Sequence, residues 1–141
     1  MPAAGRSRLR RALRGDRGSV SAELVIATPL LLLMVLAIVQ FALWSHATHI
    51  AQTAASQGLA AARVQNATAA QGFTGAQHVL DQLGRGPLTN TRIDTRCGAD
   101  AASIRVSGEA SAVIPFLHLP VHAEAAGPVE RFVPDLAAGG R

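Results

Sequence analysis

Residues 24–44 read LVIATPLLLLMVLAIVQFALW, a run of twenty-one residues without a charged side chain. As a helix rising ~1.5 Å per residue, this run spans roughly 30 Å, the thickness of the hydrocarbon core of a bilayer. Thr28 can hydrogen-bond back to its own helix, and Pro29 is tolerated near a helix start. Gln40 and Trp44 suit the far membrane interface. The sequence therefore predicts a transmembrane helix.

Charge is distributed unequally around this run. Residues 1–18 contain six arginines and one acid, a local charge of +5, whereas seven arginines and eight acids follow from Ser19 onward, a charge of −1. Basic residues beside a membrane helix stay in the cytoplasm. We therefore expect a basic cytoplasmic leader at residues 1–18 and a cell-membrane protein that crosses once, with the residues after Trp44 outside the cytoplasm.

The net charge of +4 does not indicate nucleic-acid binding. A nucleic-acid-binding domain spreads basic side chains over a folded face and places stacking or base-reading side chains among them. Here the basicity belongs to the leader, and aromatic residues make up 4% of the chain. We expect no nucleic-acid partner.

Other interpretations of the apolar run compete with a membrane anchor. A buried helix of a soluble protein is rarely so long and so uniformly apolar. A removed secretory signal has an apolar region of about 7–15 residues followed by small residues, and Ser45-His46-Ala47 could serve, but the run is longer. The pair Arg10-Arg11 faintly resembles a twin-arginine signal, although Asp16 and Glu23 separate it from the run.

The segment before the run, Gly18-Ser19-Val20-Ser21-Ala22-Glu23, ends the basic leader in a glycine and places a lone carboxylate five residues later. An ionised carboxylate deep in a membrane helix costs ~2.5–3.5 kcal/mol, and less near the interface. A solvated acid at a helix N-terminus, favoured by the helix dipole, would be one adequate account of Glu23.

The order of basic leader, glycine, four residues, glutamate and long apolar helix resembles the class III signal of type IV pilins and pseudopilins. In that family a membrane-embedded prepilin peptidase cuts after the glycine, so the resemblance implies cleavage between Gly18 and Ser19. Glu23 would then be the fifth residue of the mature chain, where the family carboxylate neutralises the α-amino group of a neighbouring subunit. Unlike charges gain more by pairing in an apolar medium than in water.

A narrower resemblance is to the TadE-like pseudopilins of the Flp/Tad (tight adherence) pilus system. Their pattern is matched by Gly18, a Ser/Ala-rich stretch, Glu23, Pro29 and a leucine run at 30–33, and the tail segments 104–108 and 127–132 look similar. The absence of a tyrosine after Glu23 and the length of the chain disfavour a major pilin. The resemblance implies a minor pseudopilin or pilus-assembly component. Its implied partners are membrane lipid, prepilin peptidase, other Tad pilins or pseudopilins and assembly platform proteins.

Residues 45–65 are rich in alanine and free of proline, so we expect the helix to continue past the bilayer, over residues 19–66, with Asn66 as its terminator. Small side chains along this extension predict a surface on which other helices pack closely. They are Ala47, Ala51, Ala54, Ala55, Gly58, Ala61 and Ala62.

A small α+β domain is expected over residues 67–133, followed by a disordered tail at 134–141. Thr68 and Gln71 predict a capping box for a second, short helix, broken at Gly84-Arg85-Gly86-Pro87. The apolar face expected for this helix comprises Ala69, Phe73, Ala76, Leu80 and Leu83. Strands expected at 93–97, 103–113 and 121–126 form a small antiparallel sheet against the second helix.

No catalytic or metal-binding pattern stands out in the sequence. His46 and His49 share a helix face and His118 and His122 form another close pair, but no carboxylate or cysteine cluster completes either as a metal site. Cys97 is the single cysteine. We expect no enzyme and no cofactor. The alternative to a pseudopilin is an unprocessed single-pass membrane protein whose outer domain binds a partner.

The spacing from Gly18 to Glu23 predicts a specific mature N-terminus. In a host with the pilus machinery, the membrane-extracted protein should begin at Ser19, as read by intact mass or N-terminal sequencing. A protein that still begins near Met1 in that host would contradict the class III signal.

Overall fold

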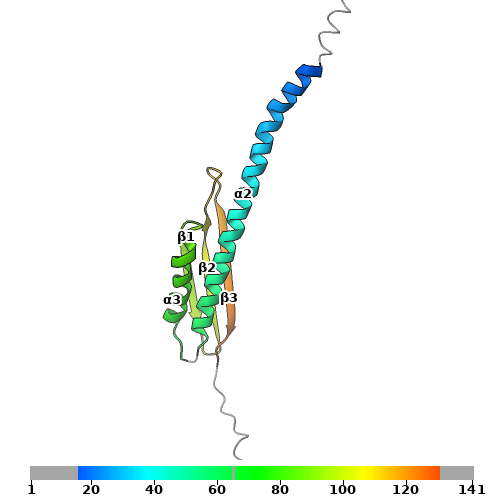
Figure 1. Cartoon of the computed structure of the whole chain (residues 1–141). Helices are drawn as coiled ribbons and strands as arrows, with labels where there is room; N and C mark the ends of the chain where they lie inside the picture. The colour runs from blue at the N-terminus through cyan, green and yellow to red at the C-terminus, as the bar shows by residue number, and fades with distance from the viewer. Residues whose placement is uncertain (1–15, 65, 131–141) are drawn as a thin grey trace, which may run out of the picture. The chain divides into compact units, whose positions relative to one another are not determined.

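A computed structural model describes residues 16–64 and 66–130 (Figure 1). The predictions for the leader up to residue 15 and for the tail at 134–141 lie outside these residues. The elements are helices α2 (Asp16–Ala62) and α3 (Ala69–Val79), a wider π-helical turn η1 (Leu80–Gly84), and strands β1 (Leu88–Cys97), β2 (Ala101–Ala110) and β3 (Leu119–Pro128). The predicted α+β class, with a long helix, a short helix and a small antiparallel sheet, is confirmed.

The chain divides into two compact units between Ile38 and Val39. The second unit contains the C-terminal part of α2, helix α3 and the sheet, and it holds the hydrophobic core. A single helix therefore belongs to both units.

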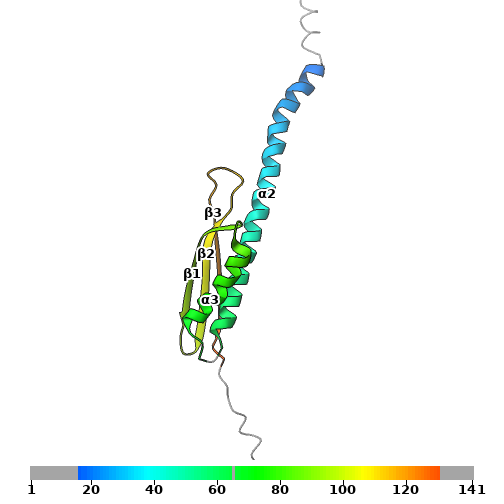
Figure 2. The same cartoon turned by 60° about the vertical axis from the view of Figure 1, so that its left-hand side comes forward.

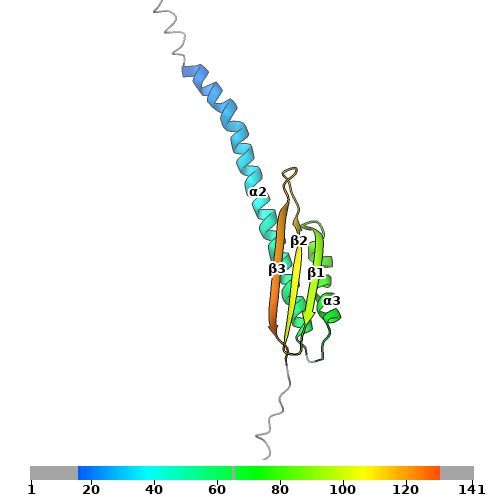
Figure 3. The ribbon, with the colours of Figure 1, turned by 180° about the vertical axis from the view of Figure 1, so that it is seen from behind.

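The sheet is an antiparallel meander in the order β1-β2-β3 (Figure 3). All three predicted strands exist, but their bounds differ. β1 begins five residues before the predicted start at 93, and β3 extends beyond 121–126 at both ends. β2 ends at Ala110, so residues 111–113 belong to a loop rather than to the predicted strand.

A bulge in β1 keeps its side chains in phase with the core. Leu88 is buried and Ile93 packs against the core, yet an odd separation would place them on opposite faces of a regular strand. The register shift between Thr89 and Arg92 inserts the extra residue, and Asn90 takes a φ of 53° there. Opposite the bulge, a Cβ on Gly108 would lie 3.0 Å from the Thr89 carbonyl oxygen, which explains the glycine.

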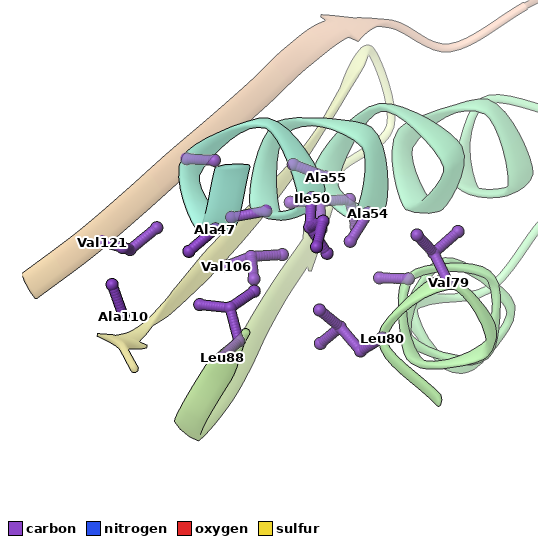
Figure 4. Close-up of a cluster of buried hydrophobic side chains, with 14 of the residues drawn as sticks. Ala47, Ile50, Ala54, Ala55, Val79, Leu80, Leu88, Val106, Ala110 and Val121 are labelled. Atoms are coloured by element: carbon purple, nitrogen blue, oxygen red, sulfur yellow. The ribbon is translucent and has the colours of Figure 1, made fainter. Parts of the chain in front are cut away.

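The C-terminal part of α2 packs its small side chains against the inner face of the sheet (Figure 4). The largest fully buried side chains are Ile104, Val106 and Val121, all on the two strands β2 and β3. Burying each such side chain stabilises the fold by ~1.5–3 kcal/mol. Alanines supply the facing surface of the helix: Ala47, Ala51, Ala54, Ala55 and Ala62.

Helix α3 crosses α2 at a contact that only small residues allow. A Cβ added to Gly58 would lie 2.8 Å from the Gly72 carbonyl oxygen and 2.9 Å from the Ala76 Cβ. A Cβ added to Gly72 would lie 2.9 Å from the Ala62 Cβ. The predicted close packing on this surface is confirmed, but its partners are the chain's own sheet and α3. This surface is therefore largely buried within the chain, except for Ala61, which is half-buried and lines an open groove.

The apolar face predicted for α3 is wrong at three of its positions. Ala69, Phe73 and Leu83 are exposed, while Ala76 and Leu80 are buried as expected. Gly72 and Val79 complete the buried face. The close approach of α2 leaves no room for a phenylalanine, so the smaller neighbour faces inward. The sheet correspondingly packs against α2 as well as against the second helix.

The second half of α2 and strand β3 match in length and are tied at their ends. Trp44 to Ala62 extends ~27 Å along a helix, and Pro120 to Pro128 extends ~26 Å along a strand. At the C-terminal end, Arg63 Nε donates a hydrogen bond to the Pro128 carbonyl oxygen at 2.9 Å. The Arg63 carbonyl oxygen accepts one from the Glu130 N–H at 2.9 Å.

Helix α2 ends at Ala62, four residues before the predicted terminator. Asn66 instead forms the following turn, with a φ of 64°. The predicted cap of α3 is present, since the Gln71 side-chain oxygen accepts a hydrogen bond from the Thr68 N–H at 2.9 Å. The predicted break after α3 also holds, because η1 ends at Gly84.

Replacing Gly58 with leucine tests the helix crossing. Although leucine has a helix propensity ~1 kcal/mol better than glycine, Gly58→Leu should lower the free energy of unfolding by about 2–3 kcal/mol, because the side chain would collide with the α3 backbone. Ser56→Leu, at an exposed position of the same helix, should change it by less than about 0.5 kcal/mol. Chemical unfolding in detergent measures both, and equal effects would contradict the close crossing.

Candidate functional site

The sequence motif that precedes the apolar run lies on helix α2. Because α2 begins at Asp16, the positions of Gly18, Ser19 and Glu23 are all helical in the uncleaved chain. The Glu23 side chain is exposed, and its carboxylate makes no hydrogen bond or ion pair within residues 23–64 and 66–130. It is therefore open to a partner outside this part of the chain.

Helix geometry relates Glu23 to the predicted cleavage point. Residues four apart lie on the same helix face, so Ser19 and Glu23 are neighbours along one side of α2. Cleavage before Ser19 would create an α-amino group one helical turn from the carboxylate. The arrangement can thus provide a cation and an anion close together at the start of the apolar run, while the cleavage and the role of Glu23 stay predictions.

After Glu23, α2 presents large apolar side chains on every side. Of its most apolar 18-residue window, only 6% is buried within the chain. The exposed side chains include Leu24, Val25, Ile26, Leu30, Leu31, Leu32, Leu33, Met34, Val35 and Ile38. A core helix of a soluble protein would bury most of such a window, so this helix is a candidate membrane span that fits membrane anchoring.

Pro29 lies well inside α2 rather than near its start, which corrects the sequence-based expectation. Proline has no N–H, so the carbonyl of Val25 loses its usual helical donor. The residue before the proline, Thr28, donates a hydrogen bond from Oγ1 to the Leu24 carbonyl oxygen at 2.7 Å, as predicted. This hydroxyl adds a second donor to the Leu24 carbonyl and does not reach the Val25 carbonyl that Pro29 leaves without a helical donor.

Gln40 does not face the membrane interface as expected but is buried, with 3% of its surface exposed. Its Nε2 donates a hydrogen bond to the Ser111 carbonyl oxygen at 3.3 Å. Its Oε1 accepts hydrogen bonds from the N–H groups of Val113 at 2.8 Å and Ile114 at 3.4 Å. One amide side chain therefore holds the loop between β2 and β3, residues 111–118, against α2.

Trp44 lies one turn further along α2 and makes a second tie. Its indole Nε1 donates a hydrogen bond to the Pro120 carbonyl oxygen at 3.2 Å. The exposed Phe41 lies beside it, with the two ring centroids 5.9 Å apart. Tryptophan commonly lies at the membrane interface because its ring is apolar and its N–H is polar. Phe41 and Trp44 therefore lie at the C-terminal end of the apolar run at residues 24–44.

The domain formed by the C-terminal part of α2, helix α3 and the sheet has an open groove and several exposed polar side chains. An open groove runs between α2 and α3 and is lined by Ala60, Ala61, Ala70, Gly75 and Leu83 among others. His46, His49, His118 and His122 are all exposed, as is the thiol of Cys97. The part of the chain that the structure describes holds no group of three or more His, Cys, Asp or Glu side chains able to bind a metal ion.

The outer face of the sheet is polar and carries a cross-strand ion pair. Arg105 on β2 lies opposite Glu124 on β3, and their closest side-chain atoms are 2.8 Å apart. The hydrogen bond and the negative charge of Glu124 raise the pKa of the Arg105 guanidinium. Such exposed pairs contribute little to stability, so this face is best described as a solvated surface.

Comparison with known proteins bears on the helix and its motif. Residues 18–60 match a family model described as TadE-like protein. The match begins at the glycine of the predicted cleavage point, includes Glu23 and the apolar helix, and supports the resemblance found in the sequence. It is consistent with a protein associated with the Tad pilus. No curated protein and no solved structure matched the chain.

Removing the Gln40 side-chain amide tests its structural role. Gln40→Leu should lower the free energy of unfolding by ~1–3 kcal/mol, because three backbone groups of the loop lose their partner. Hydrogen exchange at the amides of Val113 and Ile114 should accelerate. Gln52→Leu, at an exposed position of the same helix, is the control and should leave both quantities near their original values. Unchanged hydrogen exchange at Val113 and Ile114 in Gln40→Leu would contradict the hydrogen bonds between Gln40 and the loop.

Proposed function

We propose that this chain is a minor pseudopilin or pilus-assembly component of a Flp/Tad-type pilus. It acts as a membrane-anchored structural and interaction protein and has no catalytic activity of its own. The observation that carries the proposal is the coincidence of the TadE-like match over residues 18–60 with an apolar helix that is exposed on all sides. A glycine and a carboxylate stand at the start of that helix in the order used by pilin-like signals.

The distribution of charge supports one orientation in the membrane. Residues 1–18 carry a charge of +5, and the helix from Leu24 to Trp44 carries none. Basic residues are retained on the cytoplasmic side. In this proposal the leader lies in the cytoplasm, α2 crosses the cell membrane once, and α3 with the sheet lies outside the cytoplasm.

Removal of the leader would give each subunit an α-amino group that can pair with Glu23 of a neighbouring subunit. Prepilin peptidase cuts between Gly18 and Ser19, and the new α-amino group of one subunit pairs with Glu23 of its neighbour. Neither charge is stable alone in an apolar medium, so subunits are favoured in the register that pairs them. The exposed Glu23 side chain, without a partner in residues 23–64 and 66–130, supports this role.

The surfaces of the chain indicate where partners bind. The small-residue face of α2 is buried under the sheet, so it is not the bundling surface. Contact with other Tad pilins or pseudopilins and with assembly platform proteins is left to the apolar segment of α2 before Gln40 and to the open groove between α2 and α3. Membrane lipid covers the apolar segment before assembly.

Removing the carboxylate tests the proposal. Glu23→Leu should leave membrane insertion intact, because it makes the helix more apolar, but should strongly reduce recovery of pilus partners by crosslinking and pull-down. A solvated acid at a helix end contributes only ~0.3–1 kcal/mol through the helix dipole, too little to abolish a complex. The fraction of protein in the membrane is measured alongside recovery.

Ala27→Leu is the matched control, because it adds apolar surface to the same segment and keeps the carboxylate. This variant should recover partners normally. Normal recovery with Glu23→Leu would reduce Glu23 to an ordinary helix-start acid and remove the pilin-like mechanism.

A further inference from the structure

The loop between β2 and β3, residues 111–118, is apolar and exposed. It reads SAVIPFLH and extends beyond the ends of the strands (Figure 2). Phe116 is 98% exposed and Val113 is 46% exposed. No acidic or basic residue occurs from Ala110 to Leu117. An exposed phenylalanine in an uncharged loop is unfavourable in water. Burial of the Phe116 side chain against an apolar surface would therefore be favourable.

The backbone of the loop is arranged so that Phe116 points outward. The Leu117 N–H donates a hydrogen bond to the Ile114 carbonyl oxygen at 3.3 Å, which closes a turn with Pro115 and Phe116 at its centre. Phe116 has a φ of 65°. The third residue of such a turn is usually glycine or asparagine, because a large side chain is strained at positive φ. Strain of this kind is typical of positions that serve a function.

Hydrogen bonds from two side chains of α2 fix the position of the loop along the helix. Gln40 holds the backbone of Val113 and Ile114, and Trp44 holds the carbonyl of Pro120. Gln40 precedes Trp44 by one helical turn, ~6 Å along the axis. The loop therefore lies beside the last turns of the apolar segment of α2, at the level of the exposed Phe41 ring.

The two ends of the sheet differ in polarity. The turn between β1 and β2 contains Asp100, and Arg96 lies near the end of β1 just before it. The nearby Arg63 and Glu130 side chains approach to 3.7 Å. This end is exposed and charged, as expected for a surface in water. At the other end, the uncharged loop extends beyond the strands, so one end of the domain is suited to lipid and the other to water.

We propose that the β2–β3 loop inserts Phe116 and Val113 into the outer leaflet of the membrane beside the exit of α2. The loop then forms a second membrane contact that fixes the orientation of the outer domain. This inference rests on the proposed membrane anchoring by α2.

Lipid is favoured over a second copy of the chain as the occupant. The loop is tied to the helix turn that leaves the membrane, so any chain anchored by α2 brings the loop to the lipid surface without a further partner. Phe41, Trp44 and Phe116 together supply the aromatic side chains that favour the interface between lipid tails and headgroups.

Fluorescence quenching in lipid nanodiscs tests the inference. An environment-sensitive fluorophore is attached at one cysteine of the full chain: at Phe116→Cys or Leu33→Cys, each combined with Cys97→Ala, or at the native Cys97. Phe116 and Leu33 are exposed, so the substitutions leave the core intact. Nanodisc lipids carry a nitroxide quencher either near the headgroup or at the end of the acyl chain.

The label at position 116 should be quenched most by the nitroxide near the headgroup, the label at 33 most by the deep nitroxide, and the label on Cys97 by neither. Quenching at 33 without quenching at 116 would overturn the loop insertion while preserving the anchor. A blue-shifted but unquenched label at 116 would overturn it in favour of a protein contact. Loss of quenching at 33 as well would overturn both the insertion and the membrane anchoring on which it rests.

Discussion

The fold depends on the close packing of the small-residue face of α2 against the sheet and α3. Gly58 and Gly72 lie so close that a single Cβ on either would collide with the other helix. With small side chains on the helix, the hydrophobic volume is supplied by the strands, through Ile104, Val106 and Val121. The same packing buries most of the small-residue surface that would otherwise be free for helix bundling.

The change in surroundings along α2 links this packing to function. From Leu24 to Val39 the helix exposes large apolar side chains, and after Trp44 it has a small-residue face covered by the sheet. The strand beside it, β3, is tied near Trp44 at one end and near Arg63 at the other. The hydrogen bonds of Gln40 and Trp44 therefore lie at the point along α2 where the exposed apolar surface ends and the packing against the sheet begins.

Much of this organisation could be predicted from the sequence, because it depends on local patterns. The length of the apolar run, the Gly18 to Glu23 spacing and the alternation in β2 each report on nearby residues. Gln40 could not be placed in this way, since its partners in the loop are 71 to 74 residues further along the chain.

The buried face of α3 was misassigned for a related reason. Sequence patterns place the larger apolar side chain, Phe73, inside, whereas the tight crossing with α2 selects Gly72. The exposed apolar loop carried a usable signal, since an uncharged run from Ala110 to Leu117 that contains Pro115-Phe116 is unusual for a connection in water. The fold, the candidate span and the TadE-like resemblance agree with the structure and the family match, while the roles of Gly18, Ser19 and Glu23 depend on events outside a single chain.

The most direct test of the central claim is a spin-label scan along α2 in lipid nanodiscs, from position 30 to position 60. Labels before Gln40 should be accessible to oxygen dissolved in lipid at every position. Labels after Trp44 should instead alternate with the helical period, protected at positions 47, 50, 51, 54 and 55 and accessible to a water-soluble relaxation agent at positions 46, 49, 52, 53 and 56. A helical period that begins before Gln40, or uniform lipid exposure that continues past Trp44, would contradict the account.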